Sequence, residues 1–328
     1  MAKKKESVFQ IDEEVVRELR AAQWTYGKGN DDVFELRLEL ASPAAVTAEK
    51  ASAPAVGLPT LDGFLSYIAF RVAVSEVLKV NPSLAQRVLW QWNTSLRKPT
   101  AWIDFKLPIQ QHVLRGHTLY DCSVGLPIVN DDILYPAGSL FTADGKAYEQ
   151  YPKVVDSIPL RRRVAEPYGR QIELKSNLVS GSGKTKALDN RLHFPLTQGY
   201  SFLFRGDAAG VEKLISFAIE NNVGIGKKTS LGFGRISSFS VSRSDLGETW
   251  CRSPVLTDDR KALIKSLPFD LVFAEKDSGS KTLEKFLGCN QFSLQALIET
   301  FGTYRPPYWL RERRTQIIRY GSIIQERR

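Results

Sequence analysis

Hydrophobic and polar residues alternate strictly over residues 33–40 (VFELRLEL), so one face of this segment is apolar and the other is charged. Such alternation is typical of a half-buried β-strand. A second strand is expected from Tyr200 to Arg205, where Leu203 adds an apolar residue to the polar side and predicts burial on both faces. The β-branched and aromatic content of residues 235–241 indicates a third strand.

Apolar residues recur at helical spacing after each of the first two strands. One predicted helix covers residues 61–78 and begins after Thr60, a suitable N-cap. The other covers residues 211–219 and ends at Asn221-Asn222. The second strand, its helix and the third strand form one strand–helix–strand unit. Matched with the earlier strand at 33–40 and helix at 61–78, this unit suggests two halves of βαβ type, the pattern of ferredoxin-like folds. We predict an α+β, ferredoxin-like (RRM-like) fold.

The remaining sequence is divided around this pattern. Residues 31–243 form the predicted domain, with two short strands at 126–139 around an Asn-Asp-Asp turn. Residues 1–30 are an N-terminal extension with one short charged helix. Residues 244–328 are a helical, Arg-rich C-terminal extension, in which helices are expected at 258–266 and 280–300.

The net charge of the chain indicates the class of its partner. The 328 residues include 45 Lys and Arg against 36 Asp and Glu, giving a net charge of +9, which favours an acidic partner such as nucleic acid. The three cysteines are widely spaced and suggest neither a disulfide framework nor a metal site. We expect no cofactor, no signal peptide and no membrane segment, and hence a cytoplasmic protein.

A segment with four glycines, GIGKKTSLGFGR, lies between the second helix and the third strand. Glycines let backbone N–H groups approach an anion closely, and the neighbouring cations add positive charge. An isolated Gly-x-Gly is usually only a turn, but here two occur together with basic residues. The predicted RNA-binding residues of this glycine loop are Gly224, Gly226, Lys227, Lys228, Ser230, Gly232, Gly234 and Arg235.

The glycine loop does not match a nucleotide-binding P-loop. The first glycine of that motif would fall at Asn221, and the residue after Lys227 is Lys228 rather than Ser or Thr. A second segment, Gly183-Lys184-Thr185, has Leu178 where the first glycine is needed. A P-loop also opens a helix, whereas this loop precedes a strand. We expect no ATP site.

Residues 159–190 are basic, polar and rich in glycine, which suits an exposed hairpin. Near the C-terminus, arginines and aromatic residues cluster at 304–319. Residues 305–309 (RPPYW) fit either phosphate contacts with base stacking or a packed structural anchor, and both interpretations stay open. The hairpin adds six predicted RNA-binding residues: Arg161, Arg162, Arg163, Lys175, Lys184 and Lys186.

The chain has only three histidines, so an imidazole general acid or base must be His112, His117 or His193. His117 lies between Arg115 and Tyr120, which could stabilise a pentavalent phosphate and position a 2′-hydroxyl during RNA cleavage. A lone histidine is more often structural, so this interpretation is an alternative.

The glycine loop at 224–234 resembles the C-terminal glycine-rich loop of the RAMP superfamily of CRISPR proteins. Residues 61–65 (LDGFL) resemble the entry of that family's first helix, and residues 126–127 and 135–139 resemble the hairpin that follows. The resemblance covers about residues 30–243 and implies a RAMP fold with a thumb-like basic hairpin.

Within that superfamily the chain is most similar to the Cas-five-type subunit of type IV CRISPR effector complexes, with residues 305–309 as weaker support. The resemblance implies a noncatalytic subunit that caps the 5′ handle of the CRISPR RNA and contacts Cas-seven-like backbone subunits. Further implied partners are a large or small effector subunit, target DNA and a helicase. The two extensions depart from a minimal RAMP domain, so no role is carried over to them.

Two other functions fit the same residues. The first is a RAMP endoribonuclease that processes CRISPR precursor RNA with His117. The second is a single-strand binder without sequence preference, which would bind handle and scrambled RNA equally well.

Overall fold

The computed structural model describes parts of the chain from residue 13 to residue 326. The longest described stretches are 13–29, 31–44, 58–84, 103–129, 197–226, 232–244, 263–273 and 315–326. Shorter ones are 132–133, 148–150, 192–194, 229, 292–296, 299–302 and 304–306.

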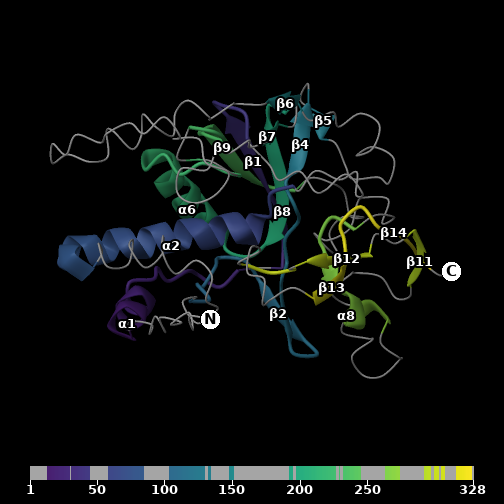
Figure 1. Ribbon diagram of the computed structural model, residues 1–328, viewed down its shortest axis with the longest axis horizontal. Coiled ribbons are helices and arrows are strands. Elements are labelled where there is room, and N and C mark those ends of the chain that lie inside the picture. The colour runs from purple at the N-terminus through teal and green to yellow at the C-terminus, as the bar shows by residue number, and fades with distance from the viewer. Residues whose placement is uncertain are drawn as a thin grey trace, which may run out of the picture.

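The centre of the molecule is an antiparallel sheet with two helices on one face (Figure 1). Helix α2 (Leu61–Val80) follows the first strand, and helix α6 (Ala208–Glu220) follows the strand next to it in the sheet. The strands lie in the order β5 (Asp132–Ile133), β4 (Leu126–Val129), β8 (Gly199–Arg205), β1 (Val33–Leu40) and β9 (Ile236–Arg243).

This arrangement confirms the coarse fold prediction. The chain is mixed α+β, and its antiparallel sheet is compatible with a ferredoxin-like fold. Strand β1 pairs with both β8 and β9, so the first strand of the pattern lies in the interior of the sheet, next to the edge strand β9. The hydrophobic pattern predicted these strands correctly, because a strand with one buried face must alternate with a period of two residues.

The apolar face of the sheet is aromatic and lies under the helices. Leu36 pairs with Phe202, and Leu38 pairs with Tyr200, and all four side chains are fully buried. Leu203, on the opposite face of β8, is also fully buried, so that strand is covered on both sides as its sequence predicts.

Helix α2 is apolar around most of its circumference because it packs on two sides. Leu65 and Ile68 pack in the cluster formed with the sheet. Phe70 and Val77 instead pack in a second cluster that includes residues of helix α1 (Glu13–Ala21). The short charged helix expected near the N-terminus is therefore present and covers the outer side of α2 (Figure 1).

A separate hairpin, β2 (Gln111–Leu114) and β3 (His117–Tyr120), is joined by the two residues Arg115 and Gly116. Both adopt positive φ, 49° and 77°, the conformation that a tight hairpin turn requires. A further short pair consists of β6 (Tyr148–Gln150) and β7 (Leu192–Phe194).

The C-terminal region differs from its prediction. Within the described residues of the two expected helices, residues 263–266 are not helical, and residues 292–296 and 299–300 are strands. The region contains one short helix, α8 (Phe269–Phe273), among its described residues. Its strands are β10 (Leu267–Pro268), β11 (Phe292–Ala296), β12 (Glu299–Gly302), β13 (Thr315–Ile318) and β14 (Ile323–Glu326).

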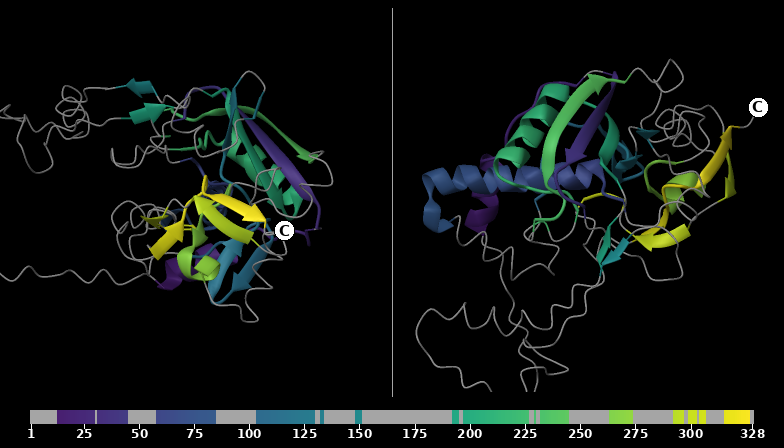
Figure 2. Two further views of the ribbon diagram at one scale, coloured as in Figure 1. Left: turned by 90° about the vertical axis from the view of Figure 1, so that its right-hand side faces the viewer. Right: turned by 90° about the horizontal axis from the view of Figure 1, so that it is seen from above.

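Strand pairing overrides helical propensity there, because β12 and β10 both bond to β13 and β11 bonds to β14. The C-terminal strands lie beside the main sheet, near the start of α2, whereas the other end of α2 points away from them (Figures 1 and 2). Ile264 and Tyr320 pack in the core cluster of the main sheet. The region is thus continuous with the domain's core.

Candidate nucleic-acid interface

The glycine loop begins where helix α6 ends. Asn222 has a positive φ of 52°, and the backbone N–H of Val223 donates to the carbonyl oxygen of Ala218 (2.7 Å). The loop then closes on itself, because the N–H of Ile225 donates to the carbonyl of Gly234 (2.8 Å). Its two limbs, residues 223–226 and 232–235, therefore lie against each other just before β9 begins.

Two of the glycines are explained by this close approach. A Cβ atom at Gly224 would lie 2.8 Å from the carbonyl oxygen of Gly234, and one at Gly234 would lie 1.9 Å from that of Ile225. Both distances are too short for any side chain, and Gly234 also has a positive φ of 64°. The shape of the loop therefore requires glycine at positions 224 and 234, and their contact with RNA stays a prediction.

The other two glycines have a different reason. Gly226 and Gly232 adopt φ of 93° and 92°, which residues other than glycine rarely tolerate. A Cβ atom at Gly232 would meet nothing within 4 Å, so the space beside this backbone is open. A ligand could approach the main chain closely at Gly232.

Four carbonyl oxygens of the glycine loop accept hydrogen bonds within the chain, at 2.7–2.9 Å. Those of Gly232 and Arg235 accept from the Ser42 hydroxyl and the Ala41 N–H, which follow β1. Those of Gly234 and Thr229 accept from N–H groups of the loop itself. Carbonyl oxygens carry partial negative charge and would repel a phosphate. Because these oxygens accept hydrogen bonds within the chain, they repel an anion beside the loop less strongly.

Arg235 is the last residue of the second limb, and its side chain is exposed. One guanidinium nitrogen donates to the amide oxygen of Asn222 (2.9 Å), which holds the group next to the start of the loop. Guanidinium offers five N–H donors in a planar fork that suits phosphate oxygens. Gly224, Gly226, Gly232, Gly234 and Arg235 thus belong to one loop, and their role in RNA binding stays a prediction.

The other predicted binding residues lie outside the described part of the chain. These are Lys227, Lys228, Ser230, Arg161, Arg162, Arg163, Lys175, Lys184 and Lys186.

The polarity of α6 also matters for this site. The loop follows the C-terminal end of the helix, where the helix dipole is negative. A nucleotide phosphate at a P-loop is bound instead by a helix N-terminus. Any anion at this loop must therefore be bound by loop N–H groups and basic side chains.

The face of the sheet away from the helices differs from that of an RNA-stacking sheet. Arg37 pairs with Ser240 and Ser201, and Glu35 pairs with Ser242, so these residues share that face. Among the described residues of β1 and β9, it carries Glu35, Glu39 and several serines and has no aromatic ring. Domains that bind RNA on a sheet stack bases on aromatic side chains there.

His117 has partners that the sequence did not reveal. Its Nε2 lies 2.7 Å from Oδ2 of Asp270 in α8, and its Nδ1 lies 2.8 Å from the hydroxyl oxygen of Tyr304. In the neutral imidazole, Nε2–H donates to the carboxylate and Nδ1 accepts from the hydroxyl. Both ring nitrogens are thus bonded within the chain. No pattern in the sequence marks Asp270 or Tyr304 as partners, since they lie far along the chain.

Tyr120, the other suggested catalytic group, lies inside the protein. Burial, together with the nearby charge of Asp62, raises the pKa of Tyr120 to about 12. A phenol that holds its proton this firmly is a poor general base at neutral pH.

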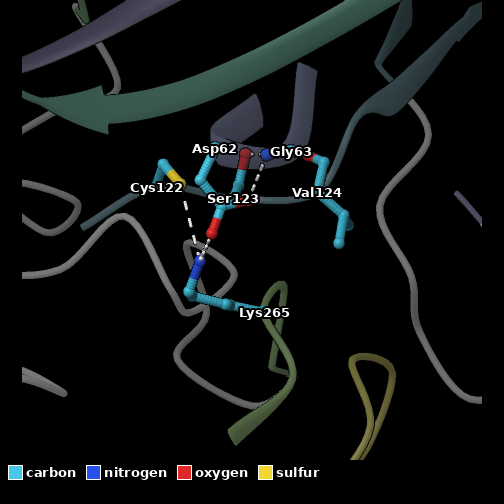
Figure 3. A network of polar contacts seen from close by, with 6 residues as sticks. All are labelled: Asp62, Gly63, Cys122, Ser123, Val124 and Lys265. Carbon is cyan, nitrogen blue, oxygen red and sulfur yellow. Dashed lines mark hydrogen bonds and ion pairs between the residues drawn. The ribbon is translucent and has the colours of Figure 1, made fainter. Parts of the chain in front are cut away.

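A buried polar cluster joins the C-terminal region to the start of α2 (Figure 3). The Lys265 ammonium donates to Oδ2 of Asp62 (3.1 Å) and lies 3.5 Å from the Cys122 sulfur. Burial, followed by the charge of Asp62, raises the pKa of the Cys122 thiol to about 12. Burial, the largest single cause, lowers the pKa of Lys265, but the charges of Asp62 and Cys122 and the hydrogen bonds to both together outweigh it, so the pKa is raised. Cys122 therefore remains a protonated thiol and is not a candidate nucleophile.

The residues that sequence reasoning missed beside the loop are Ser42, Pro43 and Asn222. Ser42 and Pro43 come directly after β1, in a segment whose Ala, Ser and Pro content signals only a loop. Their contact with the glycine loop depends on β1 and β9 being neighbours in the sheet.

Comparison with known proteins gives no relative: no family model and no curated protein matches this chain. None of the helices in the described parts of the chain is long and apolar enough to cross a membrane.

Proposed function

We propose that this protein is a noncatalytic, RAMP-type subunit of a type IV CRISPR ribonucleoprotein that binds the 5′ handle of the CRISPR RNA. The observation that carries this proposal is the geometry of the glycine loop. The two sides of the loop are hydrogen-bonded to each other, and the carbonyls of Gly232, Gly234 and Arg235 are bonded within the chain. The space beside the Gly232 backbone is open, and the Arg235 side chain is exposed.

A polynucleotide suits this site better than a mononucleotide. The loop has no helix N-terminus to bind a terminal phosphate, so its cations must act from the loop and its flanks. A chain of phosphates passing over Gly232 would meet Arg235 next, and Lys227 and Lys228 belong to the same loop. The net charge of +9 adds long-range attraction for such a chain.

The finer parts of the assignment rest on the resemblance. The loop follows the second helix of the pattern and precedes its last strand, which supports a RAMP-type glycine loop. The basic hairpin at 159–190 would act as a thumb against the guide strand or a neighbouring Cas-seven-like subunit. The other proposed partners are a large or small effector subunit, target DNA and a helicase. Cytoplasmic location belongs to the same proposal.

The direct test is an affinity measurement with labelled handle RNA over a series of salt concentrations. Lys227→Ala combined with Lys228→Ala should weaken binding and reduce the salt dependence, by about 0.7 in the log–log slope for each phosphate that is no longer neutralised. Arg235→Ala should reduce the slope by the amount expected for one phosphate. Arg243→Ala is the matched control, because Arg243 is exposed at the far end of the same strand, 2.6 Å from Asp32.

The same preparation separates the competing functions. Equal affinity for handle and scrambled RNA would favour a binder without sequence preference. Metal-independent cleavage of repeat RNA that is abolished in His117→Ala would favour the endoribonuclease. The bonding of both His117 nitrogens within the chain supports the noncatalytic proposal, since a general base needs a free nitrogen facing its substrate.

A further inference from the structure

Residues 41–43, which follow β1, are hydrogen-bonded to the second limb of the glycine loop. The hydroxyl of Ser42 donates to the carbonyl oxygen of Gly232 (2.7 Å) and accepts from the N–H of Arg235 (2.9 Å). The N–H of Gly234 donates to the carbonyl of Pro43 (2.9 Å). The N–H of Ala41 donates to the carbonyl of Arg235 (2.8 Å). Four hydrogen bonds therefore join three consecutive residues to the limb.

The side chain of Ser42 takes part in two of these four hydrogen bonds. A hydroxyl can donate one hydrogen bond and accept others, and Ser42 does both, to atoms three residues apart in the limb. It thereby fixes both the Gly232 carbonyl and the backbone that carries the Arg235 guanidinium. Alanine at this position could replace neither bond.

We propose that Ser42 is a positioning residue of the RNA site: it sets the limb from Gly232 to Arg235 so that the nucleic-acid strand crosses the end of the β1–β9 pair. This inference rests on the proposed function. It adds to the proposed RNA site a residue that is distant in sequence from the glycine loop, and it gives the bound RNA strand a path.

The face of β1 and β9 away from the helices, here called the open face, is an unfavourable path for the RNA strand. Glu35 and Glu39 lie on it, and each accepts a hydrogen bond from a serine hydroxyl, Ser201 and Ser238 respectively. Arg37 lies on the same face, 3.6 Å from Glu35, so the two carboxylates and one guanidinium of β1 sum to −1 and do not attract a polyphosphate. The face also has no aromatic ring for a base among its described residues in β1 and β9. The strand therefore follows the loop end of the sheet.

The test measures the affinity of the full chain for handle RNA in single variants. Ser42→Ala should weaken binding by about three- to tenfold, the effect of one or two hydrogen bonds, and Ser42→Thr should restore most of it because the hydroxyl is kept. Ser240→Ala is the matched control, since this serine lies on the open face opposite Arg37. It should leave affinity unchanged.

A double-mutant cycle distinguishes positioning from a general loss of stability. If Ser42 acts through the limb, the effect of Ser42→Ala should shrink when Arg235 is already alanine. Additive effects, unchanged affinity in Ser42→Ala, or an equal effect in Ser240→Ala would each overturn the inference. If the unsubstituted protein does not bind handle RNA, the proposed function itself fails, so the two failures are distinct.

Discussion

Asp62 and Lys265 are 203 residues apart in sequence and form an ion pair of 3.1 Å whose two side chains are almost completely buried. The pair links the first turn of α2 to the segment that leads into β10. Oδ1 of Asp62 also accepts from the N–H of Gly63 (2.9 Å), so both carboxylate oxygens are bonded. The C-terminal region is thereby fixed to the domain by a contact that tolerates little change.

Breaking this pair should destabilise the protein strongly. Lys265→Met leaves the Asp62 carboxylate buried without its cation, and we expect the free energy of unfolding to fall by about 3–5 kcal/mol in urea titrations. Adding Asp62→Leu should recover much of that free energy, because two apolar side chains replace two charges. Lys79→Ala removes an exposed pair with Glu76 and should change stability by less than about 0.5 kcal/mol. Similar effects of Lys265→Met and Lys79→Ala would contradict the burial of the pair.

Stability should decrease at alkaline pH. Burial raises the pKa of Tyr26, Tyr120 and Cys122 to about 12, above the ordinary values of 10.0 and 9.0. The unfolded chain therefore loses these protons first, so the stabilisation is complete below about pH 9 and is lost as the pH rises towards 12. Lys265 contributes with the same sign. Urea midpoints should be lower at about pH 10.5 than at about pH 8.5, and equal or higher midpoints would contradict the burial of these groups.

The two kinds of glycine in the loop should respond differently to alanine. Gly234→Ala places a Cβ atom 1.9 Å from a backbone oxygen and should cost more than about 2 kcal/mol of stability. Gly232→Ala meets no atom within 4 Å and should cost only about 1 kcal/mol, from its positive φ. Thermal unfolding of both variants measures the difference. Equal destabilisation would show that the close approach of the two limbs is not needed.

His117 should behave as a structural contact between the β2–β3 hairpin and the C-terminal region. His117→Ala removes bonds to Asp270 and Tyr304 and should lower the free energy of unfolding by about 1–3 kcal/mol. Val113→Ala, on an exposed position of the same hairpin, is the control and should change it by less than about 0.5 kcal/mol. Unaltered stability in His117→Ala would leave the imidazole available for another role.

Local patterning was enough to find the elements of the main sheet. Alternation over β1 and the apolar spacing of α6 follow from burying one face against the core, and the apolar content of α2 follows from packing on two sides. Each constraint acts within its own segment. The same reasoning placed the glycine loop between α6 and β9. It failed at 292–296 and 299–300, where pairing with β14 and β13 decides the conformation.

The amino-acid sequence alone was enough to find β1, α2, β8, α6 and β9 in order, the basic character of the chain and the loop glycines with Arg235. Only the tertiary structure decided which glycines serve loop closure, that Ser42 holds the loop, that His117 bonds to Asp270 and Tyr304, and that Lys265 is paired with Asp62. The physical reason is the same in each case. Hydrogen bonds and ion pairs depend on distances of about 3 Å between groups far apart in sequence, and periodicity describes only neighbours along the chain.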